Sequence, residues 1–283
     1  MKTYITIGGC CLCFESDHPI RIEDPERPFI TTGTDSAPVN IRVIHNATCP
    51  PLPSVPMTGE DLLMEHYQEQ DRRLALTKGG MGTYLATTVS NLDYSDIVCY
   101  LNQGPDGSLN CMGKLLRLLP LCALLQSKGI MFLHASQIEV GGKGILFSAP
   151  SGTGKTTQAK LWKKYRNARI ICNDRTLIRD GYTYGYPVDG SEPVYSTEVL
   201  PLGAIVLLEQ FTENRNQRAR PSEVMTRLIP QMVIDRWDTA AAQLAADQLM
   251  NLLQKVPVYI LRCTPDLGAV ECLEEQLYKD GVL

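Results

Sequence analysis

One short segment, residues 144–165, constrains the fold of this chain more than any other. Its sequence, GILFSAPSGTGKTTQAKLWKKY, passes from an apolar run through a Gly-rich turn into a helix-compatible stretch. Gly152 and Gly154 leave room for successive backbone N–H groups to face an anion, because glycine has no Cβ. A strand, a Gly-rich loop and a helix in this order predict a phosphate-binding loop.

Single residues of the loop have separate expected roles. Lys155 adds a point charge for the outer phosphates, and Thr156 offers a hydroxyl to Mg²⁺. Ala149 occupies the place of the pattern's first glycine, which requires that its backbone avoid positive φ. A plain Gly-Ser turn is the alternative, but it needs neither the lysine nor the paired threonines. The expected nucleotide-binding residues are Ser151, Gly152, Thr153, Gly154, Lys155, Thr156 and Thr157.

Two polar residues are expected at the same edge of the sheet as this loop. Asp174 follows the β-branched run 169–172, so its carboxylate is placed to bind Mg²⁺, although Asn173 and Asp174 could also simply begin a turn. His134 follows the apolar run 130–133, one strand before the loop, and is either an active-site or a structural histidine.

Two further loops leave their interpretation open. The segment 184–191 concentrates Gly, Pro and Asp189 between strands, and it lines a substrate pocket or forms a surface turn. Arg215, Arg218 and Arg220 form a basic patch, which meets an anionic ligand or is a solvated loop.

Composition excludes several classes of protein. With 44% hydrophobic and 20% charged residues, the chain has the composition of an ordinary folded protein, and its net charge of −4 argues against a nucleic-acid-binding surface. The most apolar run, 115–125, is interrupted by Arg117 and Pro120, so no membrane span is expected. The N-terminal segment lacks a signal-peptide core, and the ten cysteines have no regular spacing. We therefore expect a cytoplasmic protein with reduced thiols, including the Cys10 and Cys13 pair.

At 283 residues the chain is long enough for two domains. Residues 1–112 read as a small β-rich domain, with strands expected at 4–7, 11–15, 39–44, 84–89 and 97–101. Residues 113–283 read as an α/β domain around the phosphate loop. Its expected helices are 114–127, 222–232, 239–255 and 265–279, the last capped by Thr264, and its expected strands are 131–140, 144–147, 169–172, 202–209 and 258–263.

The order of histidine, strand, phosphate loop and acid carries a family resemblance. The run from His134 to Asp174 resembles the catalytic core of HPr kinase/phosphorylase and its smaller serine-kinase-like relatives, and more distantly phosphoenolpyruvate carboxykinase. The resemblance covers residues 114–283. It implies a P-loop HPr-kinase/carboxykinase-like fold and ATP-dependent phosphoryl transfer, with His134 near the acceptor, Lys155 and Thr156 on phosphate and metal, and Asp174 on Mg²⁺.

The chain departs from this family at Asn173. HPr kinases have two acids in tandem here, and the first, which resembles a general base, corresponds to Asn173, whose amide cannot accept the proton. The loop also ends in two threonines, and the Arg-rich C-terminal signature of HPr kinases is absent from the sequence. HPr itself is therefore a poor candidate substrate.

Three functions follow from these observations. The leading hypothesis is a kinase that transfers the γ-phosphoryl group of ATP to a hydroxyl of a peptide, protein or small metabolite. The second is a catalytically weakened ATP-binding protein that acts as a partner- or peptide-binding module. A carboxykinase acting on a keto acid is the weakest of the three. The acceptor and the oligomeric state, a homo-oligomer included, stay open.

Overall fold

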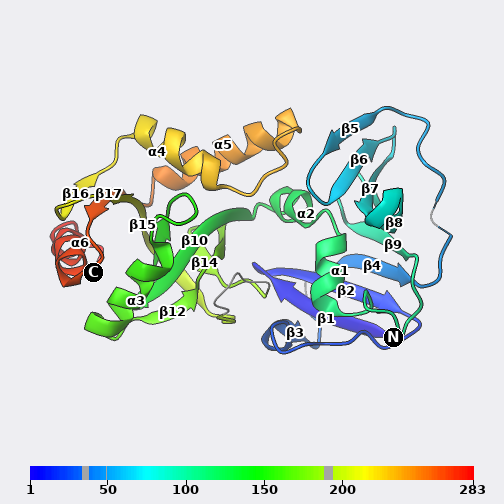
Figure 1. The fold of residues 1–283 in the computed structure, drawn as a ribbon, viewed down its shortest axis with the longest axis horizontal. Coiled ribbons are helices and arrows are strands. Elements are labelled where there is room, and N and C mark those ends of the chain that lie inside the picture. The colour runs from blue at the N-terminus through cyan, green and yellow to red at the C-terminus, as the bar shows by residue number, and fades with distance from the viewer. Residues whose placement is uncertain (34–37, 49, 188–193) are drawn as a thin grey trace. The chain divides into compact units, whose positions relative to one another are not determined.

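The computed structural model describes residues 1–33, 38–48, 50–187 and 194–283 (Figure 1). It contains two β-sheets and several helices, which agrees with the expected mixed α/β class. Contacts divide the chain into two compact units. Unit 1 comprises residues 1–128 and 235–242, and unit 2 comprises residues 129–234 and 243–283.

A nine-stranded sheet forms the body of unit 1, in the order β3-β1-β2-β4-β9-β8-β7-β6-β5. Apolar and polar residues alternate along its strands, as a half-buried strand requires. In β4, Val39, Ile41 and Val43 are buried, whereas Asn40 and Arg42 are exposed. The strands and 3₁₀ helices are β1 Lys2–Ile7, β2 Cys10–Ser16, η1 Arg27–Phe29, β3 Ile30–Thr31, β4 Val39–Ile44, β5 Met57–Glu60, β6 Met64–Gln68, β7 Arg72–Lys78, η2 Gly80–Gly82, β8 Tyr84–Asn91 and β9 Asp96–Leu101.

The prediction of a single helix over 114–127 is wrong, because this range contains two helices. α1 spans Met112–Leu118 and α2 spans Leu121–Ser127. Pro120 separates them, and Leu119 before it is extended (φ −87°, ψ 151°). A proline lacks the amide hydrogen that a helix needs and disfavours helical backbone at the preceding residue. Both helices lie in unit 1, although they follow the boundary expected at residue 112.

Unit 1 also contains a short segment from the C-terminal half of the chain. Residues 235–242 include Trp237, whose ring lies beside His66 at 4.8 Å between ring centroids. The amide Nε2 of Gln126 donates to the backbone oxygen of Ala241 at 2.6 Å. These contacts tie the segment to β6 and α2.

Unit 2 is built on an eight-stranded sheet. Its strands follow the order β11-β10-β13-β14-β15-β17-β16, β12 pairs with β10, and β11 also pairs with β15. The strands expected from the sequence in this part of the chain are confirmed. The sheet contains β10 Met131–Val140, β11 Lys143–Ser148, β12 Arg169–Cys172, β13 Arg175–Arg179, β14 Tyr182–Tyr184, β15 Val199–Gln210, β16 Arg215–Arg218 and β17 Val258–Cys263.

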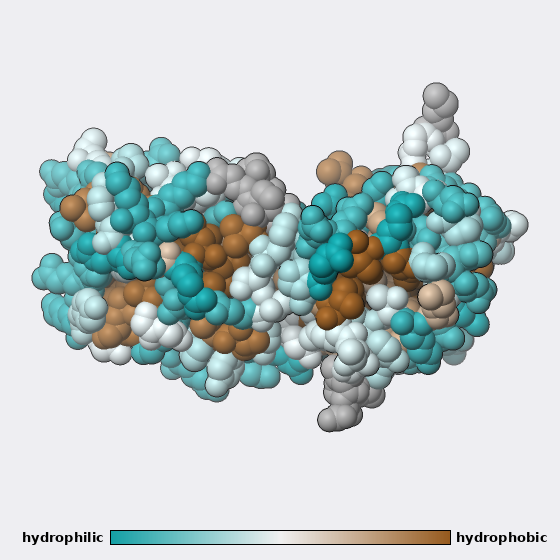
Figure 2. Space-filling view, turned by 90° about the horizontal axis from the view of Figure 1, so that it is seen from below, coloured by the Kyte–Doolittle hydropathy of each residue, from teal (hydrophilic) through white to brown (hydrophobic). Residues whose placement is uncertain are grey.

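Helices cover both faces of this sheet. α4 Pro221–Leu228 and α5 Thr239–Leu253 pack on one face, and α3 Lys155–Arg166 and α6 Leu267–Lys279 pack on the other. Because side chains alternate along β15, Leu207 contributes to the first core and Val206 to the second. Figure 2 shows apolar residues in patches on the surface, flanked by hydrophilic residues.

Two helix ends differ from the sequence prediction. The helix expected over 222–232 ends at Leu228 and continues as the 3₁₀ helix η3 Ile229–Gln231, which contains Pro230. The N-cap of α6 is Asp266, which accepts a hydrogen bond from the amide of Ala269, rather than Thr264. Within the described residues, no helix combines the length and apolarity that a membrane crossing requires.

Candidate functional site

The phosphate loop has the backbone that the sequence predicts. It joins the end of β11 to the start of α3, with Gly152 at φ +78° and Gly154 at φ +116°. Both values lie in the region that side chains with a Cβ avoid, so these two glycines are required by the turn. Ala149 has no positive φ, as its residue type demands. The loop can therefore present its amides to an anion at the start of a helix.

Lys155 lies in the first turn of α3 and is only 7% exposed. Its Nζ donates to the backbone oxygens of Ala149 at 2.9 Å and Pro150 at 3.4 Å, so the side chain folds back over the loop. Burial lowers the pKa of Lys155, and the negative charge of Asp174 acts in the opposite direction. The ammonium group and this carboxylate therefore lie close enough to interact.

Helix α3 is anchored so that the loop keeps its place. Gln158, Ala159 and Trp162 are buried on one side of the helix, while Lys163 is exposed. Asn167 ends the helix in the left-handed conformation (φ 53°), a position where asparagine is tolerated. The positive charges of the basic residues in the last turn interact favourably with the negative C-terminal end of the helix dipole and so stabilise the helix.

His134 and Asp174 form a pair beside the loop. Nε2 of His134 lies 2.9 Å from Oδ1 of Asp174, and both side chains are partly exposed. When the carboxylate is ionised it only accepts hydrogen bonds, so Nε2 is then the donor; in the neutral imidazole Nδ1 is the acceptor nitrogen. A histidine oriented in this way can take a proton from a hydroxyl group.

Hydrogen bonds to backbone oxygens hold together the segments that carry this pair. The amide of Ala135 donates to the oxygen of Asp174 at 3.0 Å, and Oγ of Ser136 donates to the oxygen of Asn173 at 2.6 Å. Oγ of Ser148, the last residue of β11, donates to the oxygen of His134 at 2.9 Å. The structure thus brings His134, Asn173, Asp174 and the loop together at one sheet edge. Asn173 itself is buried.

The residues at this edge carry oxygen ligands of the kind that would hold Mg²⁺. Among the described residues, no three His, Cys, Asp or Glu side chains are grouped to hold a metal by themselves. Magnesium commonly takes one or two carboxylates and completes its shell with substrate phosphates and waters. Asp174 with the hydroxyl of Thr156 is a set of that kind.

Two residues at this edge were missed by sequence reasoning. Arg175 directly follows Asp174, and its Nε lies 3.6 Å from Oδ2 of that carboxylate. Gln210 ends β15, and its Nε2 lies 3.4 Å from the backbone oxygens of Gly152 and Thr153. The signal available for Gln210 was its place directly after the apolar strand expected over 202–209.

Glu209 lies at the same edge but is already occupied. Its carboxylate accepts hydrogen bonds from Arg227 of α4 and from Nε of Arg262 of β17, the latter at 2.6 Å. Burial alone would raise the pKa of Glu209, but the hydrogen bonds from the two guanidinium groups outweigh it and lower the pKa. Glu209 is therefore engaged by two cations and does not complete the metal site.

The two further segments singled out in the sequence, 184–191 and the basic patch, do not add residues to this site. Asp189 lies outside the described residues, so the role of the segment 184–191 stays a prediction. In the basic patch, Arg215 pairs with Glu213 and Arg220 pairs with Glu223 at 3.7 Å. These pairings fit a solvated patch, but the expectation of a loop is wrong for Arg215 and Arg218, which lie in β16.

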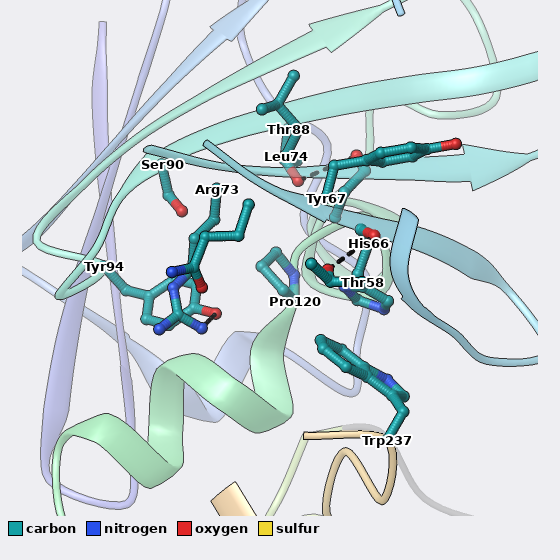
Figure 3. Close-up of a pocket in the computed structure, with 12 residues that line it drawn as sticks. Thr58, His66, Tyr67, Arg73, Leu74, Thr88, Ser90, Tyr94, Pro120 and Trp237 are labelled. Carbon is teal, nitrogen blue, oxygen red and sulfur yellow. Dashed lines mark hydrogen bonds between the residues drawn. The ribbon is translucent and has the colours of Figure 1, made fainter. Parts of the chain in front are cut away.

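Unit 1 contains a small pocket of its own, shown in Figure 3. Arg73 and Tyr94 lie on one side, His66 and Trp237 on the other, and Pro120 between them. The guanidinium group of Arg73 lies over the ring of Tyr94 at 5.2 Å and donates to its hydroxyl at 3.2 Å.

The volume of this pocket limits what it could bind. It holds about 20 Å³, which is room for about one water molecule. His66 Nε2 is within 3.0 Å of Oδ2 of Asp61, and Oγ1 of Thr58 donates to the backbone oxygen of His66 at 2.9 Å. Nε of Arg73 and Nε1 of Trp237 have no hydrogen-bond partner there. The volume still has no room for a ligand larger than water, so the phosphate loop is the candidate site.

The chain is similar to a known protein family and, distantly, to a solved structure. The family model "SynChlorMet cassette protein ScmC" matches residues 97–274, more than half of the chain. No curated protein matches. Among solved structures, the HPr(Ser) kinase/phosphatase from Coxiella burnetii is similar at 11% sequence identity and a TM-score of 0.26, over 53% of this chain and 95% of that chain.

Proposed function

The chain belongs to the family of the SynChlorMet cassette protein ScmC, and with the site in unit 2 as evidence we propose that it is an ATP-dependent kinase. The observation that supports this most is the juxtaposition of three groups: the glycine-built loop, the buried Lys155, and the His134–Asp174 pair whose carboxylate acts on that lysine. Phosphoryl transfer depends mainly on positioning and charge neutralisation, which such a set supplies.

The proposed reaction uses these residues in separate roles. The loop amides and Lys155 hold the phosphates, and Thr156 with Asp174 would hold Mg²⁺, which neutralises phosphate charge when bound. A hydroxyl oxygen of the acceptor forms a bond to the γ-phosphorus as the bond from that phosphorus to the β–γ bridging oxygen breaks. The products are a phosphate monoester and ADP. The hydroxyl proton passes to Nδ1 of His134, which takes over the role that Asn173 cannot perform.

Substitution of Asp174 tests the metal role. Asp174→Asn should weaken nucleotide binding about tenfold or more in Mg²⁺ and leave binding in EDTA unchanged. The apo variant should stay folded, because the amide has nearly the same shape and its oxygen can accept from Nε2 of His134. Isothermal titration calorimetry with ATP measures the affinity, and thermal unfolding checks the fold.

Asp180→Asn is the matched control for this experiment, because Asp180 is an exposed acid of unit 2 that pairs with Arg179 at 3.5 Å. Its affinity for MgATP should equal that of the wild type. An Asp174→Asn variant that unfolds without nucleotide, or that keeps full Mg²⁺-dependent affinity, would show that the carboxylate serves the fold and not the metal.

Substitution of His134 tests the base. We expect ADP formation by the wild type in MgATP with a pool of serine peptides and small hydroxyl compounds, and a decrease of about 10²- to 10⁴-fold in His134→Ala. Asn173→Asp should not increase the rate, because a second acid beside Asp174 in a buried position raises one of the two pKa values. His18→Ala, an exposed histidine of unit 1, should behave as the wild type.

The same assay separates the kinase from the second candidate, an ATP-binding module with lost catalysis. The buried amide of Asn173 favours that candidate. Nucleotide binding without ADP formation in any of these four proteins would support the module. A faster Asn173→Asp variant would show instead that the enzyme lacks a base and that His134 does not replace it.

A further inference from the structure

The strands that meet at the phosphate loop stand in a fixed order. β12, β10, β11, β15 and β17 are successive neighbours, and β11, β15 and β17 are parallel. β12 is antiparallel to β10, which is antiparallel to β11, so β12 also ends at the loop edge. Asp174 therefore lies on one side of the loop, and the ends of β15 and β17 lie on the other.

This order gives a bound nucleotide a direction. If the phosphates lie on the loop and the metal-bound end faces Asp174, the nucleoside extends the opposite way, over β15 and β17. This step rests on the proposed function, because it takes MgATP as the ligand. The residues that follow those two strands are then the ones that can contact the base.

An exposed aromatic ring lies at that place. Phe211 follows the last residue of β15 and is 46% exposed. Its amide donates to the backbone oxygen of Cys263, the last residue of β17, at 3.1 Å. The preceding residue, Gln210, is the one whose amide group lies beside the loop. A single exposed phenylalanine is ordinary, but this one lies between two strand ends next to a phosphate loop.

The backbone around Phe211 is held in place. The carboxamide Oδ1 of Asn214 accepts hydrogen bonds from the amide of Thr264 at 3.0 Å and from its hydroxyl at 3.2 Å. Nδ2 of Asn214 donates to Oδ1 of Asp266, the N-cap of α6, at 3.1 Å. These bonds fix residues 211–214 against the end of β17. A ring on a fixed loop loses little conformational entropy when a ligand binds.

We propose that Phe211 is the base-stacking residue of the nucleotide site, with the purine of ATP lying on its ring. Exposed aromatic rings bind bases through stacking, which requires no particular hydrogen-bonding pattern. Glu209 is close by, but its carboxylate is not available to contact the base, since it already accepts hydrogen bonds from Arg227 and Arg262. The site therefore has a phosphate-binding part, residues 149–157, and a separate base-binding part at Phe211.

Two ligands separate these parts in a binding experiment. Calorimetry with MgATP reports both, whereas calorimetry with magnesium tripolyphosphate, which has no base, reports only the phosphate part. Phe211→Ala should weaken MgATP binding by about 5- to 100-fold and leave the tripolyphosphate affinity unchanged. Phe211→Trp should keep the wild-type affinity for both ligands.

Tyr278→Ala is the matched control, because Tyr278 is a 60% exposed aromatic residue near the far end of α6 in the same unit. It should bind both ligands as the wild type does. Thermal unfolding of Phe211→Ala should match the wild type, since the ring is exposed.

Each contrary outcome has a distinct meaning. Wild-type MgATP affinity in Phe211→Ala, or an equal loss for both ligands, would overturn the stacking role. A wild type that binds both ligands equally well would also overturn it, while leaving the phosphate site intact. A wild type that binds neither ligand would overturn the proposed function and this inference with it.

Discussion

Replacement of Lys155 by alanine is expected to abolish nucleotide binding. At 100 times its dissociation constant, MgATP stabilises the native wild type by about 2.7 kcal/mol, which raises the melting temperature by roughly 5 to 10 °C for a unit of this size. Lys155→Ala should show no shift, because the one buried ammonium group of the loop is lost. A thermal shift titration with MgATP makes the measurement.

The matched control is Lys163→Ala, which removes an exposed lysine from the same helix. Its melting temperature should rise with MgATP as that of the wild type does. Lys155 also bonds to two loop carbonyls, so the apo variant is first compared with the apo wild type. Equal shifts for wild type and Lys155→Ala would remove the basis for a nucleotide site at this loop.

Replacement of Gly59 by alanine is expected to destabilise unit 1. A Cβ at this position would lie 1.9 Å from Cδ2 of Trp237 and 2.3 Å from its Cε3. The ring is held by its contact with His66, so it cannot move without loss of packing. Forced overpacking costs about 1–3 kcal/mol and sometimes more. The midpoint of urea unfolding measures the loss.

Gly80→Ala is the matched control, since a Cβ there meets no atom within 4 Å. Its unfolding midpoint should stay near that of the wild type. The fluorescence of Trp237 gives a second readout, measured in a Trp162→Phe background because the chain has only two tryptophans. A Gly59→Ala protein with an unchanged midpoint and spectrum would show that the ring of Trp237 does not pack against Gly59 of β5.

Local sequence patterns were sufficient to predict many helices and strands of unit 2. The glycines of the loop, the helix after it and the apolar strands at 169–172 and 258–263 were predicted because each depends on neighbours a few residues away. The same reasoning failed within 57–78, where β5, β6 and β7 were not expected. These strands carry Glu, Gln, Arg and Lys among their apolar residues, so their alternation is weak.

The position of a strand within its sheet could not be predicted from the sequence either. β7 carries Arg72, Arg73 and Lys78, a composition typical of an edge strand, but it lies between β6 and β8. Arg73 is instead half-buried against Tyr94. The order of strands depends on which apolar faces are buried together, and no single strand contains that information.

The sequence by itself determined the backbone of the Gly-rich loop, since the left-handed conformation at Gly152 and Gly154 requires glycine whatever surrounds it. Only the tertiary structure decided what stands beside that loop. His134 and Asp174 are 40 residues apart and meet because β10 runs between β11 and β12. Phe211 reaches the loop edge because β15 pairs in parallel with β11. Such pairings are set by burial of the whole sheet, which acts over distances along the chain that local spacing does not encode.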